Sequence, residues 1–518
     1  MLLYFSIWMI LNVAVIPCCD GASKPCQRRD FPEATSFVCE CSASYCDTIE
    51  RDAKPRSGQY AVYTSSKDGD RFQRQLLMLE NEAKHDHHLT IDDSQKYQEI
   101  LGFGGSFTDS ATMNILNLSD GATENLLKSY FSTEGLEYSA GRVPVASCDF
   151  SSSTYSYADT PGDYDLSEFE LAYQDIHYKI PVIRAALDMS PRELKLIASP
   201  WSAPAWMKTN GKMAGGGSLI GQPGGQVYQT WALYFVKFLL EYEKLRVSIW
   251  GMTIQNEPSA GLIPIYPWQS MAMPPEIMRD FVKLDLGPKL REYSYSHVKL
   301  ITHDDNVPSL LVGSQLIYND EEAASYLSGT AVHWYKNRGP DSYNTLTDTH
   351  LEFPDKFIVA TEACEGADLF AEPVMLGSWE RGERYSYDII QDLNHWVTGW
   401  LDWNLALDMN GGPNWANNQV DSPIIVDAER DLFYKQPMFY HLGHFSKFVP
   451  PGSVRISLEA SEISPLLSIA FKTPDDSKVA VILNELDQGV KVTLQDTDLG
   501  ELYINAYVPP RSIQTYIW

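Results

Sequence analysis

Eight short apolar segments, each ending in polar or aromatic residues, recur between residues 98 and 404 of this 518-residue chain. Longer stretches with helical character separate several of them. Strands that alternate with helices imply a parallel sheet, and eight such units predict an α/β fold closed into a (β/α)8 TIM barrel. The segments are Glu99–Asp109, Ala140–Asp149, Leu194–Trp201, Val247–Glu257, Val298–Asp305, Thr330–Tyr335, Lys356–Cys364 and Val397–Asn404.

Helical patterns fill several of the intervening stretches. The clearest is Gly225–Leu245, where aromatic and aliphatic residues recur at helical spacing among charged ones. Ser119–Tyr130 and Pro275–Lys289 are predicted as further helices. Asp165–Met189 also has a helical pattern, but Pro181 inside it predicts a kink or a division of the helix there.

Two of the segments deliver a glutamate at the strand tip. Pro258 cannot donate to a sheet ladder, so the strand that precedes it should stop and leave Glu257 at its carboxyl end. Glu362 ends a second strand in the same way. The site of a barrel forms at the carboxyl ends of its strands. Two carboxylates there suit glycoside cleavage, one as acid/base and one as nucleophile or base. The alternative is that each glutamate only caps a strand or lies in solvent.

The other strand tips supply carboxylates, aromatic rings and hydrogen-bond donors, a composition typical of a carbohydrate pocket. The glycines of Gly102–Gly105 lack the spacing of a dinucleotide fingerprint and favour close backbone packing instead, and no cofactor or metal is expected. These tip residues are Asp109, Arg142, Asp149, Trp201, Asn256, Asp305, His333, Tyr335 and Trp403.

Short β segments without helices between them flank the barrel on both sides. We therefore predict an antiparallel β-sandwich domain from residues 51–97 plus 451–518, beside a catalytic barrel of residues 98–450. The predicted strands are Gln59–Thr64, Gln75–Glu80, Leu466–Phe471, Lys478–Leu483, Val490–Leu494 and Leu502–Val508.

Three further features lie outside these patterns. His85–His88 is read as a polar run between strands, with a metal site as the alternative. Residues 405–450 begin as a long loop region placed to fold over the pocket and continue as an aromatic helix, Tyr434–Phe445. Its histidines, His441 and His444, are expected to be packed or capped.

The amino-terminal region indicates export. Residues 1–22 read as a secretory signal peptide, with a signal anchor as the alternative. Residues 23–50 form a disulfide-stapled segment, since Cys26, Cys39, Cys41 and Cys46 allow three pairings and zinc binding is less suited to an exported chain. Two isolated cysteines, Cys148 and Cys364, are expected to be free thiols. One glycosylation sequon begins at Asn117.

The formal net charge of −28 limits the class of partner. It argues against nucleic-acid binding, which needs clustered Lys and Arg, and against unaided docking on anionic membranes. An acidic chain loses self-repulsion at low pH, which suits an acidic compartment. After the first segment no other apolar run reaches about 18 residues, so no transmembrane segment is expected in the mature chain.

Twelve motifs carry a resemblance to a known family: Gly102–Gly105, Arg142–Pro144, Ala146–Phe150, Ala158–Pro161, Ser199–Trp201, Lys208–Gly211, Asn256–Gly261, Ala331–Tyr335, Glu362–Cys364, Asp402–Leu407, Gly411–Trp415 and Val420–Asp427. Together they resemble glycoside hydrolase family 30, in particular its lysosomal glucosylceramidases. Most of the chain from the cysteine cluster to Trp518 takes part in the resemblance.

The resemblance implies a retaining β-glucosidase that cuts glucosylceramide into glucose and ceramide through a covalent glucosyl-enzyme, in sphingolipid breakdown, and that also transfers glucose to sterols. It implies that Glu257 is the acid/base and Glu362 the nucleophile. The implied contacts to glucose are Asp149, Trp201, Asn256, Trp403 and Asn418, surrounded by Arg142, His333 and Tyr335, with Tyr266 and Trp268 at the entrance.

The resemblance also implies a saposin-type activator protein and anionic lipid as partners at a membrane surface, and a place in the lysosome lumen or outside the cell. Leu262–Tyr266 and residues 336–356 look individual to this chain, so acyl-chain preference and activator dependence carry over least safely. The competing hypotheses are a related hydrolase of another β-linked glycan, such as a xylanase or β-1,6-glucanase, and a non-catalytic lectin-like role.

Overall fold

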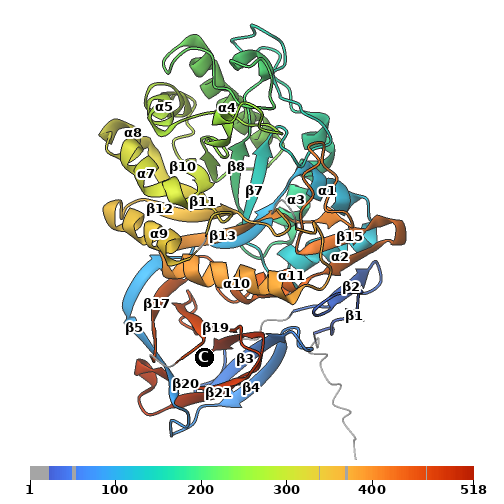
Figure 1. The fold of residues 1–518 in the computed structure, drawn as a ribbon, viewed down its shortest axis with the longest axis vertical. Helices are drawn as coiled ribbons and strands as arrows, with labels where there is room; N and C mark the ends of the chain where they lie inside the picture. The colour runs from blue at the N-terminus through green and yellow to red at the C-terminus, as the bar shows by residue number, and fades with distance from the viewer. Residues whose placement is uncertain (1–22, 50–53, 338, 368–370, 462–463) are drawn as a thin grey trace, which may run out of the picture.

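The computed structural model describes residues 23–49, 54–337, 339–367, 371–461 and 464–518. The predicted signal segment, residues 1–22, lies outside the described residues. Figure 1 shows a barrel surrounded by helices and, on one side of it, a large curled sheet that contains both early and late strands of the chain. This agrees with the predicted fold class.

All eight predicted segments contribute a strand to one closed parallel barrel. The cyclic order is β10-β11-β12-β13-β6-β7-β8-β9, so neighbours in sequence are neighbours in space and β13 pairs with β6 to close the ring. The strands are β6 (Gly102–Ser106), β7 (Ala140–Val145), β8 (Lys195–Pro200), β9 (Gly251–Thr253), β10 (Lys299–Asn306), β11 (Leu327–His333), β12 (Phe357–Glu362) and β13 (Val397–Asn404).

Helices follow the barrel strands and pack around them (Figure 1). The predicted helix Gly225–Leu245 is confirmed as α4. The helices are α1 (Asp109–Leu116), α2 (Asp120–Phe131), α3 (Ile180–Met189), α4 (Gln226–Lys244), α5 (Pro275–Phe281), α6 (Gly287–Glu292), α7 (Leu310–Tyr318), α8 (Glu321–Tyr326), α9 (Pro340–Glu352), α10 (Trp379–Asn394) and α11 (Pro437–Ser446).

Two helix predictions need correction. The helix predicted over Asp165–Met189 begins only at Tyr173 and contains a π-helical turn, Asp175–Lys179, which runs into α3. Pro181 lies two residues after this π-helical turn within one continuous helical run, so the helix changes type next to the proline. The helix predicted over Tyr434–Phe445 is in part a strand, because the chain up to Lys435 is β16 and α11 starts after it.

The strands on both flanks of the barrel join in one nine-stranded sheet. Among its described pairings, only β5 with β20 is parallel. The prediction missed β5, β17 and β22, and it read His87 and His88 as loop, whereas they begin β5. The order is β21 (Tyr503–Val508), β20 (Val490–Asp496), β5 (His87–Glu99), β17 (Val454–Ala460), β18 (Leu467–Lys472), β19 (Lys478–Asn484), β22 (Ser512–Ile517), β3 (Gln59–Ser66) and β4 (Gln73–Met78).

The sheet curls so that its two halves pack face to face as a sandwich. Ile482 of β19 lies in the same apolar cluster as Ile91 of β5 and Val492 of β20. Successive side chains of a strand point to opposite faces, so Val481 packs instead into the main core that the sheet shares with the barrel. Figure 1 shows α10 and α11 in the layer between the barrel and this sheet.

A smaller five-stranded sheet joins the amino-terminal segment to the end of the barrel sequence. The disulfides Cys26–Cys39 and Cys41–Cys46 staple this segment, and Cys148 and Cys364 are free and buried, as predicted. Its order is β1 (Arg28–Arg29), β2 (Val38–Ser42), β16 (Leu432–Lys435), β15 (Ile424–Asp427) and β14 (Leu407–Asp408).

Among the described residues, no helix combines the length and apolar character that crossing a membrane requires. The predicted packing of the two late histidines is confirmed: His441 contacts Ser386, and His444 lies between Ser65 and Thr515. Asn117 is exposed at the end of α1, on the surface as a glycosylation site would require.

Candidate active site

Glu257 follows the short strand β9 in a turn with left-handed backbone geometry, at φ 41°. Its backbone N–H donates to the carbonyl of Asp304 on the neighbouring strand β10, over 2.8 Å. This bond fixes the turn, so the carboxylate points toward the barrel axis. Tyr266 donates to Oε2 over 3.2 Å, and the Nδ1 atom of His333 lies 3.3 Å from Oε1.

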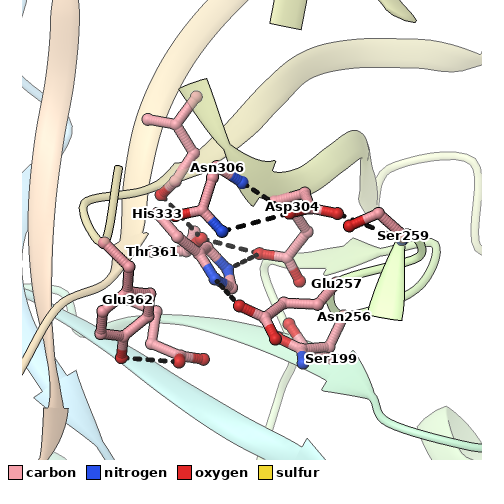
Figure 2. Close-up of polar contacts among 12 residues, drawn as sticks. Ser199, Asn256, Glu257, Ser259, Asp304, Asn306, His333, Thr361 and Glu362 are labelled. Atoms are coloured by element: carbon pink, nitrogen blue, oxygen red, sulfur yellow. Dashed lines mark hydrogen bonds and ion pairs between the residues drawn. The ribbon is translucent and has the colours of Figure 1, made fainter. Parts of the chain in front are cut away.

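Glu362 is the last residue of β12, and its carboxylate is held by two donors. The hydroxyl of Tyr335 donates to Oε1 over 2.9 Å, and Nη1 of Arg142 donates to Oε2. Glu362 therefore has a cation and a phenol as partners, while Glu257 has a phenol and an imidazole. Figure 2 shows the two glutamates below His333, with Asp304 on its other side.

The two glutamates are close neighbours. One carboxylate oxygen of each glutamate and one ring nitrogen of His333 lie within 4.8 Å of one another. Retaining glycosidases hold their two carboxyl groups about 5–5.5 Å apart, whereas inverting enzymes leave roughly 6.5–9.5 Å for a water molecule. The observed spacing fits the retaining arrangement.

These three residues also form a group that offers ligand atoms for a metal ion. His333, however, directs both ring nitrogens at carboxylates, Nδ1 at Glu257 and Nε2 at Asp304 over 3.1 Å. The guanidinium of Arg142 already supplies positive charge at Glu362. The arrangement therefore favours direct carboxylate chemistry over metal coordination.

The proton affinities of the site follow from burial and charge. Burial raises the pKa of Glu257 above its ordinary value, with a contribution from the charge of Glu362, while His333 opposes the rise. Burial disfavours the charged form of His333, but the carboxylates of Glu362, Asp304 and Glu257 outweigh it and raise the pKa of His333 to about 10. A protonated Glu257 can thus donate a proton while His333 stays cationic.

Arg142 lies beneath the cavity and connects several strands. Besides Glu362, it donates to Ser199 over 3.1 Å, to Asn256 over 2.8 Å and to Asp304 over 2.8 Å. Its side chain is inaccessible to solvent. The fork of five N–H donors explains why arginine rather than lysine suits this position.

Two parallel indoles form one wall of the cavity. The rings of Trp201 and Trp403 have centroids 5.1 Å apart at an interplanar angle of 18°, and Arg142 lies over both. Their positions at the ends of β8 and β13 follow from the barrel pattern. Stacked aromatic faces of this kind suit the C–H face of a sugar.

Asp149 and Asn418 meet at the cavity from opposite ends of the barrel sequence. The amide of Asn418 donates to Asp149 over 2.9 Å. Burial raises the pKa of Asp149 to about 7, although the hydrogen bond from Asn418 lowers it. The charges of Glu362 and Glu257 add to the rise. The pair offers an acceptor and donors to sugar hydroxyls.

The cavity has a volume of about 400 Å³, enough for a sugar ring and the start of an aglycone. Ten of the candidate site residues named from the sequence line it. Arg142 and His333 contact these residues without lining the cavity themselves, and Asp109 and Asp305 are not part of the lining. The ten are Asp149, Trp201, Asn256, Glu257, Tyr266, Trp268, Tyr335, Glu362, Trp403 and Asn418.

Some lining residues escaped the sequence analysis, namely Asn306, Trp334, Asn337, Glu365, Arg384 and Val420. Asn306 is the last residue of β10, and Trp334 and Glu365 follow the ends of β11 and β12 by one and three residues, so reading each strand to its end and slightly beyond would have found these three. The central Asp304 was passed over in favour of Asp305, although both stand in the same predicted strand tip.

An eight-stranded parallel barrel with two close glutamates at the carboxyl ends of its strands defines the class of barrel glycoside hydrolases. Residues 100–449 match the family model of the glycosyl hydrolase family 30 TIM-barrel domain, and residues 452–516 match that of its beta sandwich domain. The chain therefore belongs to glycosyl hydrolase family 30.

Individual relatives agree with the family. The chain is 48% identical over 497 residues to lysosomal acid glucosylceramidase from Mus musculus, covering 96% of each chain. The crystal structure of SrfJ from Salmonella typhimurium is 28% identical with a TM-score of 0.80, covering 89% of this chain and 99% of that one. The structure of the endo-beta1,6-glucanase BT3312 is 26% identical with a TM-score of 0.78, over 89% and 99%.

Proposed function

We propose that this protein is a retaining β-glucosidase that hydrolyses glucosylceramide to glucose and ceramide, with Glu257 as acid/base and Glu362 as nucleophile. The observation that carries the proposal is that one carboxylate oxygen of Glu257 lies within 4.8 Å of one of Glu362. The mouse relative, named a lysosomal acid glucosylceramidase, supports the choice of substrate.

The different surroundings of the two glutamates support their roles. Arg142 and Tyr335 both donate to Glu362, which favours the carboxylate that attacks the anomeric carbon. Burial favours the protonated form of Glu257, which donates to the glycosidic oxygen as the bond to the sugar breaks. In the second step Glu257 accepts a proton from water, which attacks the glucosyl-enzyme and frees Glu362.

The sugar is held by Asp149 and Asn418 on one side and stacks against Trp201 and Trp403. Asn256 accepts from Arg142 through Oδ1, which turns its side-chain amide nitrogen toward a donor role at the sugar 2-hydroxyl. A sterol hydroxyl in place of water would take the glucose in the same second step.

The entrance suits a lipid aglycone. Tyr266 and Trp268 pack edge to face at a centroid distance of 4.9 Å and line the cavity. Directly before them, Leu262, Ile263 and Ile265 are 63%, 49% and 89% exposed. Consecutive exposed apolar side chains beside an active site are typical of a docking surface. We propose that they contact the membrane that presents glucosylceramide.

The working place proposed is the lysosome lumen, with a saposin-type activator and anionic lipid as partners. The net charge of −28 opposes docking on an anionic membrane at neutral pH, so acidic conditions or an activator would assist it. An acidic pH also keeps Glu257 protonated, as the first step requires.

The test of roles uses an activated fluoro-glucoside, whose leaving group needs no proton. Glu257→Gln should still be labelled covalently, and Glu362→Gln should not. The opposite result would exchange the two roles. The test of substrate compares glucosylceramide vesicles with β-1,6-glucan at acidic pH. Glucose release from the vesicles is expected, and hydrolysis of the glucan alone would refute the substrate.

A further inference from the structure

Asp304 lies at an irregular point of β10. His303 and Asp304 have φ values of 67° and 52°, which residues other than glycine rarely adopt. The pairing of β10 with β11 shifts register at the same place, between His303 and Asp305. Bulges of this kind re-aim side chains next to active sites. Here the bulge turns the carboxylate of Asp304 into the barrel, where it is 0% exposed.

Four side chains from four other strands donate to this carboxylate. Oδ1 accepts from His333 over 3.1 Å and from Thr361 over 2.7 Å. Oδ2 accepts from Arg142 over 2.8 Å and from Thr253 over 2.6 Å. Figure 2 shows Asp304 with its carboxylate directed at His333 and the glutamates beyond. Each cationic donor in turn contacts one glutamate, Arg142 at Glu362 and His333 at Glu257.

We propose that Asp304 is a positioning residue that holds His333 as an imidazolium against Glu257, so that His333 stabilises the carboxylate formed when Glu257 gives up its proton. The inference rests on the proposed role of Glu257. In the first step the proton of Glu257 passes to the glycosidic oxygen, which also keeps the electron pair of the broken bond, while Glu362 bonds to the anomeric carbon. Asp304 and His333 exchange no proton.

The charges around the imidazole are consistent with this role. The titratable and charged groups that face His333 are Glu257, Glu362, Asp304, Asp305, His303 and Tyr335, and Arg142 pairs with the far oxygen of Asp304. Burial alone would raise the pKa of Asp304, but Arg142 and His333 outweigh burial and lower it, so Asp304 stays anionic. The carboxylate of Asp304 accepts from Nε2 of His333, which holds a proton on that nitrogen, favours the doubly protonated ring and orients Nδ1 toward Glu257.

The competing explanation is structural: Asp304 would only neutralise the buried charge of Arg142. The two explanations differ in their effect on Glu257. If Asp304 acts through His333, its loss leaves a neutral imidazole beside Glu257 and makes Glu257 harder to ionise. If it acts only through Arg142, the proton affinity of Glu257 is not raised.

Asp304→Asn tests this, because it keeps the shape and removes the charge. The alkaline limb of kcat/KM for aryl β-glucosides should move to higher pH by about half a unit or more. The loss of kcat/KM should be at least about 10-fold greater for an alkyl β-glucoside, which needs the proton of Glu257, than for a dinitrophenyl β-glucoside, which does not. An unmoved alkaline limb, or equal losses on both substrates, would overturn the inference.

Thr361→Val is the matched control, since it removes another donor to Oδ1 of Asp304 without changing a charge. Its alkaline limb should stay in place, and a shift equal to that of Asp304→Asn would also overturn the inference. If Asp304→Asn does not fold, nitrogen NMR of the wild-type histidines decides. The ring-nitrogen signals of His333 are assigned as those that disappear in His333→Gln. In the wild type they should report a doubly protonated ring up to pH 8, and a neutral ring at pH 7 would contradict the inference.

A negative result for the role of Asp304 can be distinguished from a failure of the proposed function. If the wild type releases glucose from glucosylceramide and is labelled at Glu362, the proposed function stands whatever Asp304→Asn does. If the wild type does neither, the proposed function itself is wrong.

Discussion

Arg142 and Glu362 form an ion pair at the floor of the cavity, and their side chains are 0% and 8% exposed. The same guanidinium also donates to Ser199, Asn256 and Asp304, so one side chain orders residues from β8, β10 and β12 and from the turn after β9. A buried pair of this kind is most sensitive to removal of one partner, because the other charge is left without compensation. The relationship ties the shape of the site to its electrostatics.

Arg142→Lys should therefore impair catalysis although it keeps the charge. A single ammonium cannot reproduce the planar fork that reaches four acceptors. We expect kcat/KM for aryl β-glucosides to fall by about 100-fold or more, in the range seen when a preorganised electrostatic contact is lost. The rate of labelling by the fluoro-glucoside should fall with it. Arg279→Lys, at a partly exposed ion pair on α5, is the control and should change neither rate.

Asp149 gives the site a pH-dependent affinity for cations. Because burial raises its pKa to about 7, Asp149 is largely protonated in acid and ionises near neutrality. A sugar mimic with a protonated ring nitrogen should therefore bind more tightly as the pH rises from 5 to 7, by roughly 5-fold to 10-fold. Calorimetry with such an iminosugar measures the effect. Asp149→Asn should flatten the increase, and an equally steep increase in that variant would assign it to another group.

The entrance loop should matter only for substrate in a membrane. Leu262→Ser combined with Ile265→Ser removes the two most exposed apolar side chains of the loop, which lie at 63% and 89%. We expect glucosylceramide hydrolysis on vesicles to fall several-fold, while hydrolysis of a soluble aryl β-glucoside stays within about 2-fold. Ser substitution at Val312, 61% exposed on α7, is a matched control for lost surface apolarity. Equal losses on both substrates would indicate damage to the site instead.

The barrel was predictable because its signal is local and repeated. A buried strand reads as an apolar run and ends where polar residues begin, and eight repeats leave few alternatives. The same logic placed Glu257 and Glu362 at strand tips. It was silent on which glutamate attacks the sugar, because that depends on contacts such as Arg142 to Glu362, between residues 220 positions apart in sequence.

The choice of Asp305 over Asp304 has a specific physical cause. Reading a strand as regular alternation assigns neighbouring side chains to opposite faces, and a bulge at His303 and Asp304 changes that assignment by one residue. A bulge needs no distinctive residue type, so the pattern did not reveal it. The pairing of the amino-terminal strand β2 with β16 was missed for a related reason: it joins segments nearly 400 residues apart.

Asp388 and Asp392 of α10 should make the stability of the protein depend on pH. Both are buried one helical turn apart, and within the described part of the chain neither oxygen of Asp392 has a hydrogen-bond partner. Asp388, in contrast, accepts hydrogen bonds from Asn337 and Tyr343 at one oxygen and from Trp400 at the other. Burial, together with the charge of Asp388, raises the pKa of Asp392 well above its ordinary value.

The sign of the effect follows from the proton balance. Above the ordinary carboxyl pKa, near 3.9, the unfolded chain releases the proton of Asp392 while the folded protein keeps it. The free energy of unfolding therefore falls as pH rises, by up to about 1.4 kcal/mol per pH unit, until the folded-state pKa is passed. Asp392→Asn cannot release a proton, so this part of the decline should disappear in denaturant titrations between pH 5 and 7. Asp188→Asn, at an exposed position of α3, should keep the wild-type slope. An unchanged slope in Asp392→Asn would mean that Asp392 is already ionised in the folded protein, against the burial and lack of partners that the structure describes.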